Sequence, residues 1–215
     1  MSLIRGQDGF TIVEVMISLT VLGVLIALGA PGFVEWLQNQ QIRAAAEAAL
    51  NGLQTARTEA VRSNLPVRFQ FVTDLTSGCS RINDQQNFSW VVSYSDPTGK
   101  CDQAANPADP ANPQIVQSRA GGEGSSSAWV TAVWVATPPA AGLAAADTVT
   151  FSPLGNVIAN ADTTPSIVKI DVTNPNIPPT SRRNLRIIVN AGGNLRMCDP
   201  AVVSATDPRG CPAWP

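Results

Sequence analysis

The strongest constraint in this sequence is an apolar run near the start of the chain. From Phe10 to Ala30 it holds 21 residues and one ionisable side chain, Glu14. A helix rises about 1.5 Å per residue, so the run spans about 31 Å, close to the thickness of a bilayer's hydrocarbon core. A carboxylate left near the bilayer centre without a partner costs about 2.5 to 3.5 kcal/mol. We therefore expect a membrane-spanning helix in which Glu14 has a specific role.

Two simpler explanations fit this run less well. A secretory signal peptide has a shorter apolar region, which a small-residue cleavage site follows. Here the run is longer, and the small residue Gly9 precedes it. A plain membrane anchor fits the length, but it gives no reason for Glu14.

The next stretch, residues 31–64, is expected to continue the helix with an amphipathic pattern. Pro66 disfavours helical geometry in the residue before it, so the helix should end at Asn64. One helix over residues 10–64 would be about 80 Å long, too long for one small domain to bury, so its first half must lie in a membrane or against other subunits. The apolar stripe consists of Ile42, Ala45, Ala49, Leu53, Ala56 and Ala60.

After Pro66 the pattern changes to short strands separated by turns. We expect an α+β fold: a long N-terminal helix packed against an antiparallel, sandwich-like β-sheet domain over residues 65–215. Residues 102–127 should form a long exposed loop, with Ile115 and Val116 as a brief edge strand. Trp129 and Trp134 are five residues apart and should face opposite sides of their strand. The expected strands are 67–71, 90–94, 129–135, 148–151, 167–172, 185–189 and 194–197.

Composition excludes several functions. The chain has 215 residues, a formal net charge of −2 and no histidine. Without histidine there is no imidazole acid–base chemistry, no Ser-His-Asp triad and no His-ligated metal. The near-neutral charge argues against a protein that binds nucleic acid through bulk electrostatics. We expect no enzyme activity, no cofactor and no metal.

The N-terminal segment resembles the processing site of type IV pilins and type II secretion pseudopilins, which has the pattern found here from Gly9 to Glu14. The resemblance implies that residues 1–9 are a leader, that a prepilin peptidase cuts between Gly9 and Phe10, and that the new amino group of Phe10 is N-methylated. In these families a Glu occupies the fifth position after the cut, as Glu14 does here. Paired with the amine of a neighbouring subunit, it would set the register between subunits in a filament.

Three further segments narrow the resemblance to the FimT/FimU-type minor pilins and the related GspH pseudopilins. They are an A-R-T-E-A motif within residues 53–61, an F-x-P-x-G turn within 150–156 and a tail at 192–200. This resemblance implies a single-pass protein of the bacterial inner membrane, with residues 10–30 in the membrane and the β-rich domain outside the cytoplasm. It also implies a place in the pilus after assembly with other minor pilins and the major pilin.

Three functions of different kinds follow from the resemblance. The first is a minor pilin that helps to prime assembly of a type IV pilus and lies at or near its tip. The second is a minor pilin that binds DNA during uptake in natural transformation. The third is a minor pseudopilin of a type II secretion system. The C-terminal tail resembles the pilus-side members more closely, which places the first function ahead of the other two.

The four cysteines have no pair at C-x-x-C spacing, which argues against zinc. An even number in an exported domain favours two disulfides, with three possible connectivities. We predict the pairing of sequence neighbours, Cys79 with Cys101 and Cys198 with Cys211.

A DNA site would have to be built from a few C-terminal cations. Some FimT-type pilins bind DNA through a G-R-x-R-like strand, of which this chain keeps only the second arginine, at Arg196. Phosphate binding needs several convergent cations, and its affinity falls with salt. The sequence therefore predicts at most weak, salt-sensitive binding to DNA, through Arg182, Arg183, Arg196 and Arg209.

Overall fold

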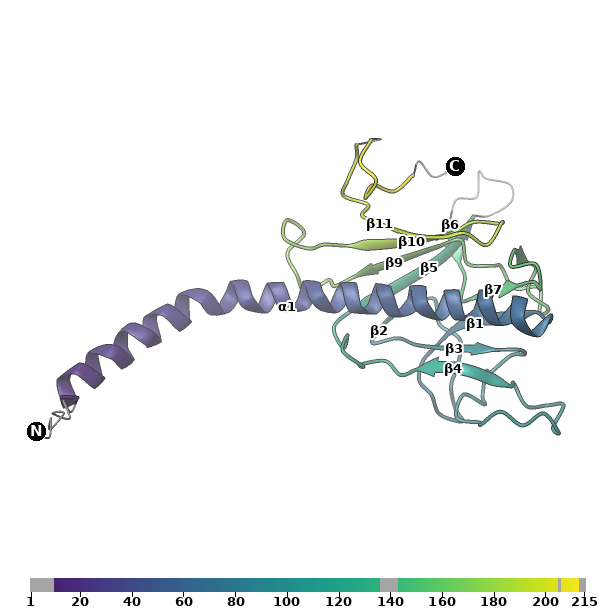
Figure 1. Cartoon of the computed structure of the whole chain (residues 1–215), viewed down its shortest axis with the longest axis horizontal. Helices are drawn as coiled ribbons and strands as arrows, with labels where there is room; N and C mark the ends of the chain where they lie inside the picture. Colours follow the sequence, from purple (N-terminus) through teal and green to yellow (C-terminus); the bar gives the residue numbers. More distant parts are fainter. Residues whose placement is uncertain (1–9, 136–142, 205, 213–215) are drawn as a thin grey trace, which may run out of the picture. The chain divides into compact units, whose positions relative to one another are not determined.

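The computed structural model describes residues 10–135, 143–204 and 206–212, so the expected leader and its Gly9 lie outside the described residues. The chain divides into two compact units, Met1–Leu37 and Gln38–Pro215. A single helix, α1 (Ile12–Ser63), contributes to both units (Figure 1). It ends one residue before the expected boundary, where Asn64 takes a left-handed backbone angle of φ 56°. Asn is one of the few residues that adopt this conformation easily, and it commonly ends helices there.

The second half of α1 lies across one face of both β-sheets of the globular unit (Figure 1). All six residues of the predicted apolar stripe are fully buried in one core cluster, so this prediction is confirmed. The approach is closest at Gly52, where an added Cβ would lie 2.8 Å from the Phe69 ring and 2.9 Å from the Trp90 ring. Small side chains on the helix therefore let large aromatic side chains of the sheet fill the space between them.

The two sheets are antiparallel throughout their strand pairings. One has five strands in the order β4-β3-β1-β7-β8, and the other has six, in the order β11-β10-β9-β5-β2 with β6 paired to β5. The strands are β1 (Val67–Val72), β2 (Asp84–Gln86), β3 (Ser89–Ser93), β4 (Ile115–Arg119), β5 (Trp129–Val135), β6 (Leu143–Ala145), β7 (Thr148–Phe151), β8 (Val157–Ile158), β9 (Lys169–Thr173), β10 (Leu185–Val189) and β11 (Leu195–Cys198).

All seven predicted strands are present, and the brief edge strand at Ile115 is confirmed as β4, at the edge of the five-stranded sheet. The two tryptophans of β5 face opposite sides, as predicted. Trp134 packs against the core, whereas the indole of Trp129 donates to the Asp84 carboxylate on the outer face. Strands β2, β6 and β8 were not predicted. They have three, three and two residues, which is too short for a periodic pattern.

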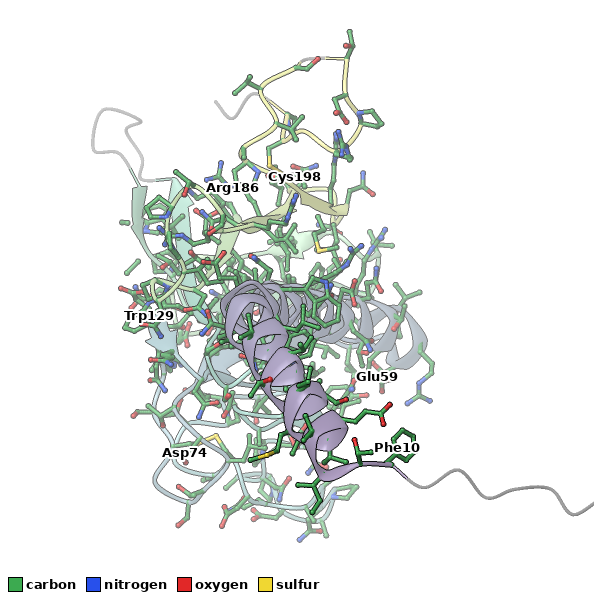
Figure 2. The ribbon with its side chains drawn as sticks, turned by 90° about the vertical axis from the view of Figure 1, so that its left-hand side faces the viewer. Phe10, Glu59, Asp74, Trp129, Arg186 and Cys198 are labelled. Carbon is green, nitrogen blue, oxygen red and sulfur yellow. A yellow bond between two sulfur atoms is a disulfide. The ribbon has the colours of Figure 1, made fainter. Side chains whose placement is uncertain are left out.

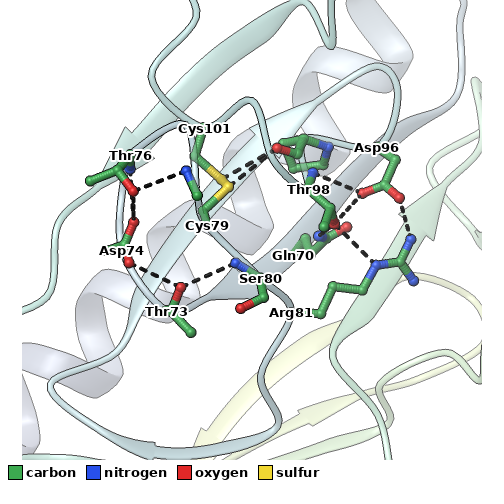
Figure 3. Close-up of a disulfide and its surroundings, with 12 residues drawn as sticks. Gln70, Thr73, Asp74, Thr76, Cys79, Ser80, Arg81, Asp96, Thr98 and Cys101 are labelled. Atoms are coloured by element: carbon green, nitrogen blue, oxygen red, sulfur yellow. Dashed lines mark hydrogen bonds and ion pairs between the residues drawn. A yellow bond between two sulfur atoms is a disulfide. The ribbon is translucent and has the colours of Figure 1, made fainter.

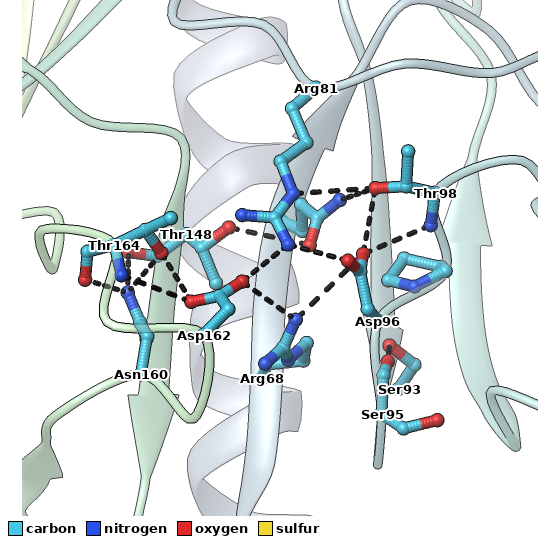
Figure 4. A network of polar contacts seen from close by, with 12 residues as sticks. Arg68, Arg81, Ser93, Ser95, Asp96, Thr98, Thr148, Asn160, Asp162 and Thr164 are labelled. Atoms are coloured by element: carbon cyan, nitrogen blue, oxygen red, sulfur yellow. Dashed lines mark hydrogen bonds and ion pairs between the residues drawn. The ribbon is translucent and has the colours of Figure 1, made fainter.

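The central strands of the five-stranded sheet, β1, β3 and β7, are buried on both faces. The inner face of this sheet meets α1, and its outer face carries Arg68, which is 5% exposed. Figure 4 shows how two loops are held over this outer face by an ion network. Arg81 Nη2 lies 2.5 Å from Asp96 Oδ2 and also contacts Asp162. Arg68 Nη1 lies between the same carboxylates, 3.8 Å from Asp96 and 3.6 Å from Asp162.

This network makes the stability of the globular unit depend on pH. Burial alone would raise the pKa of Asp162, but hydrogen bonds from Thr164 and Arg81 outweigh it and lower the pKa from 3.8 to about 2. A carboxyl group whose pKa is lower in the folded state than in the unfolded state contributes its full stabilisation at pH values above the unfolded-state pKa. That contribution is lost as the pH falls through the folded-state pKa.

We expect Asp162→Asn to destabilise the protein at pH 7 and to flatten the fall in stability between about pH 4 and pH 2. Urea unfolding at a series of pH values measures this. The exposed loop variant Asp109→Asn is the control and should leave the profile unchanged. A profile for Asp162→Asn that runs parallel to the wild type would show that the network does not act in this way.

Candidate functional site

The start of α1 holds the predicted processing and assembly residues. Phe10 is 82% exposed at the beginning of the described chain. The Thr11 hydroxyl accepts a hydrogen bond of 3.2 Å from the Glu14 backbone N–H, which caps the helix. The Glu14 carboxylate is exposed and makes no hydrogen bond or ion pair with the residues described from 10 onward. Any partner of this carboxylate would come from outside that part of the chain.

The helix of the N-terminal unit exposes apolar side chains on every side. No single helix in the described part of the chain meets the length and hydropathy requirements for a membrane span. Two parts of α1, Ile12–Ala27 and Gly32–Ser63, meet these requirements only when they are taken together. The rings of Phe33 and Trp36 stack at 5.8 Å, and both are exposed. The exposed large apolar residues before them are Ile12, Val13, Val15, Met16, Ile17, Leu19, Val21, Leu22, Val24, Leu25 and Ile26.

The A-R-T-E-A motif and the F-x-P-x-G turn meet in the globular unit. Arg57 Nε donates to the Gly155 carbonyl oxygen at 3.1 Å. The hairpin between β10 and β11 lies against the same turn, because an added Cβ at Gly193 would be 1.8 Å from the Gly155 oxygen. We call Arg57, Gly155 and Gly193 the motif junction. It joins α1 to both sheets, and the F-x-P-x-G turn has the structural role that a hairpin turn suggests.

Glu59, the acidic residue of the A-R-T-E-A motif, also has a structural role. Its carboxylate accepts two hydrogen bonds from Arg62, both of 2.7 Å, and one from the Tyr94 hydroxyl. The bonds from Arg62 and Tyr94 lower the pKa of Glu59 below its ordinary value. Burial and the bond to Glu59 raise the pKa of Tyr94. Glu59 (Figure 2) thereby fixes the last turns of α1 to the end of β3.

Both predicted disulfides are present, Cys79–Cys101 and Cys198–Cys211. The first lies in a small buried cluster with Val72 and Val91 on the outer face of the five-stranded sheet (Figure 3). The second closes a C-terminal loop that bonds back to β11. Their role is to hold the chain in place.

The structure places the four predicted DNA-binding arginines in two groups. Arg196 Nη2 donates to the carbonyl oxygens of Pro208 and Gly210, both at 2.9 Å, and these flank Arg209. Arg209 itself pairs with Asp207 at 2.7 Å. The other two, Arg182 and Arg183, lie in the segment just before β10. Arg182 Nη1 donates to the Thr173 hydroxyl at 3.3 Å, and Arg183 is exposed. Arg196 and Arg209 are thus neighbours, and they are occupied within their own chain.

Sequence reasoning missed the Arg68–Arg81–Asp96–Asp162 network and the hydrogen bond from the Trp129 indole to Asp84. The charged residues of the network are scattered over about a hundred positions, and only the strand register brings them together. No group of three or more His, Cys, Asp or Glu residues arranged to hold a metal occurs among the described residues.

A long N-terminal helix that packs on antiparallel sheets, with a sequence at its start that resembles a prepilin processing site, defines a pilin-like protein. Two family models match the chain: the prokaryotic N-terminal methylation motif over residues 4–30, and type II transport protein GspH over residues 45–193. The second match covers more than half of the chain, so the protein belongs to the GspH family. The motif junction lies inside the matched range, whereas Cys198 and Cys211 lie outside it.

Among solved structures, two crystal forms of the type IV minor pilin FimU from Pseudomonas aeruginosa are similar to this chain. One has 14% sequence identity and a TM-score of 0.42, covering 75% of this chain and 91% of that chain. The other has 15% identity and a TM-score of 0.39, covering 72% and 90% respectively. No curated protein gives a significant match.

Two neighbouring glycines allow a direct test of the motif junction. Gly193 has φ +78° and no room for a Cβ, whereas an added Cβ at Gly192 would meet nothing within 4 Å. We expect Gly193→Ala to lower the free energy of unfolding by more than about 2 kcal/mol, through the clash and the left-handed backbone. Gly192→Ala should change it by less than about 0.5 kcal/mol. Equal unfolding curves for the two variants would contradict the close packing at this junction.

The arginine positions sharpen the DNA prediction. Because Arg196 and Arg209 are engaged within the chain, we expect weak, sequence-independent binding that disappears at physiological salt. A gel shift with the mature chain in detergent measures it, since a fragment starting at Pro66 would lack the helical part of the core. Arg182→Ala/Arg183→Ala should abolish the shift, and Arg43→Ala is the control. Tight binding that persists at physiological salt would refute this expectation.

Proposed function

We propose that this protein is a minor pilin of a type IV pilus. A prepilin peptidase removes the leader after Gly9, and Phe10 becomes the N-methylated first residue. Residues 10–30 then anchor the chain in the inner membrane in a single pass, with the globular unit outside the cytoplasm. From there it helps to prime pilus assembly, together with other minor pilins and the major pilin, and takes a place at or near the pilus tip.

The observation that carries the proposal is the uncovered apolar surface of the N-terminal helix. Apolar surface costs about 25 cal/mol per Å² when it stays in water, so a helix apolar on all sides needs a bilayer or other proteins around it. The globular unit buries its own stripe on α1, whereas the side chains from Ile12 to Ile26 remain exposed. The membrane would cover this apolar surface before assembly, and the helices of neighbouring subunits would cover it afterwards.

Glu14 supports assembly rather than simple anchoring. A buried carboxylate is unfavourable unless a cation pairs with it. The described chain offers Glu14 no such cation, whereas cleavage would place a cationic amine on residue 10 of every subunit. A pair between Glu14 of one subunit and Phe10 of the next would stabilise one register between them.

A type II secretion pseudopilin is the second candidate, since the matching family carries the description of a type II transport protein. The C-terminal disulfide favours a pilus protein over a secretion pseudopilin, because it belongs to the tail that resembles the pilus-side members of the family. It lies outside the family match, and Arg196 fastens its loop to β11 through two carbonyl oxygens. DNA uptake is a third candidate, and the engagement of Arg196 and Arg209 within the chain weighs against it.

The Glu14→Ala variant tests the assembly role. We expect it to be processed and membrane-inserted but recruited to pili at least about tenfold less than the wild type, because the pair with a neighbour's amine is lost. Immunoblotting of sheared pili against membrane fractions measures this. Glu47→Ala removes an exposed carboxylate that pairs with Arg43 on the same helix, and it should assemble normally. Normal recruitment of Glu14→Ala would refute the pairing.

Deletion of the gene separates the three candidates. We expect loss of surface pili with secretion intact, and restoration of pili by the wild-type gene. Loss of type II secretion with pili intact would instead identify a pseudopilin. Loss of DNA uptake from cells that still make pili would identify an uptake protein.

A further inference from the structure

The two sheets of the globular unit differ in their outer faces. Every residue of β1, in the centre of the five-stranded sheet, is buried, because loops cover its outer face. On the six-stranded sheet the outward residues of β9, namely Lys169, Asp171 and Thr173, are all partly exposed. Pilin assembly through α1 does not account for this second face.

Strand register places a row of polar and aromatic side chains across this face. Gln86 pairs with Trp129, and Trp129 pairs with Thr173. The Thr173 hydroxyl donates to Asn184 at 2.7 Å, which extends the row to the approach of β10. At about 4.8 Å between strands, the row is about 14 Å long. We call these four residues and the adjacent Asp84 the Trp129 platform.

The Trp129 indole is held in position, and it lies outside the hydrophobic core. Its Nε1 donates to Asp84 Oδ1, which also accepts from the Thr131 hydroxyl at 3.0 Å. The other oxygen of Asp84 has no hydrogen-bond partner within the described part of the chain. Figure 2 shows Trp129 at the margin of the globular unit. The result is an aromatic surface, fixed at its edge, next to a carboxylate that can still accept a hydrogen bond.

A hydrogen-bond donor lies at the other side of Thr173. Arg182 makes one long bond to that hydroxyl, and its buried Nε has no partner. That Nε is out of reach of a ligand, but Arg182 Nη2 is not among the buried atoms and makes no hydrogen bond with the described residues, so it can donate to an added acceptor. The platform therefore offers an aromatic face, an open acceptor at Asp84, amides at Gln86 and Asn184, and a donor at Arg182.

We propose that the Trp129 platform binds a β-linked glycan that carries acetamido groups. A pyranose ring has an apolar face of C–H groups, which suits an indole, and a rim of hydroxyls, which suits amides and carboxylates. Along such a glycan, the N–H of one acetamido group can donate to Asp84, and the carbonyl of another can accept from Arg182, which lies two strands away at Thr173. The carboxylate at the edge of the indole disfavours a phosphate backbone, so the ligand is a glycan rather than a nucleic acid.

The mature chain in detergent micelles, titrated by calorimetry, tests this proposal. Chitotetraose supplies an acetylated glycan, glycan strands released from peptidoglycan supply an acetylated glycan with carboxylates, and cellotetraose is the matched glycan without acetamido groups. We expect an acetylated glycan to bind at least about tenfold more tightly than cellotetraose. Binding of both acetylated probes assigns recognition to the acetamido sugar alone, and binding only of the peptidoglycan strands assigns it to the cell-wall source.

Trp129→Ala should weaken binding about tenfold or more, and Arg182→Gln should reduce the preference over cellotetraose. Val133→Ala, on the outer face of the same strand, is the matched control and should bind as the wild type does. Melting curves establish that each variant is folded. Absence of binding to both acetylated probes, equal binding of cellotetraose, or unchanged binding by folded Trp129→Ala would each overturn the proposal.

Discussion

The α1 helix has to be stable in two different surroundings along one backbone. From residue 38 onward it presents an Ala-rich stripe that lies close to two sheets, closest at Gly52. Before that residue its apolar side chains have no cover within the described chain. Helix hydrogen bonds are satisfied within the segment, so this backbone can pass from membrane to protein without leaving polar groups unpaired. The sheets, the loops and the disulfides together form the globular unit that covers the second half of α1. A bilayer or other subunits have to cover the first half.

The family motifs act mainly by holding this helix on the sheets. Arg57 and Glu59 lie two residues apart on α1 and contact different partners, the turn at Gly155 and the hydroxyl of Tyr94. Gly193 brings the β10–β11 hairpin against the same turn. In the proposed pilin the assembly residues are therefore separated from the structural ones. Phe10 and Glu14 would act between subunits, whereas Arg57, Glu59 and Gly193 hold the fold of the GspH-type domain.

Much of this fold could be predicted from the sequence, because its largest elements have strong periodic patterns. The stripe from Ile42 to Ala60 and the strands of four to seven residues were predictable in this way. The cysteine pairs were predicted by joining sequence neighbours, one of three possible connectivities. The short strands β2 and β8 were not, since two or three residues carry no period. The ion network around Arg81 and the platform around Trp129 depend on strand register between distant segments. The four C-terminal arginines lie close to one another in the sequence. Only the structure shows that Arg196 and Arg209 are already bonded within the C-terminal loop.

Assembly as proposed depends on a cleavage that would make Phe10 the first residue and give it the amine that Glu14 needs. Mass spectrometry of the N-terminal peptide of the protein purified from its native membrane measures this most directly. We expect a mature chain that begins at Phe10 and carries a methyl group on its amine. A chain that still begins at Met1, or that has been cut after Ala30, would contradict it, because in neither case would residue 10 carry a free amine for a neighbouring Glu14.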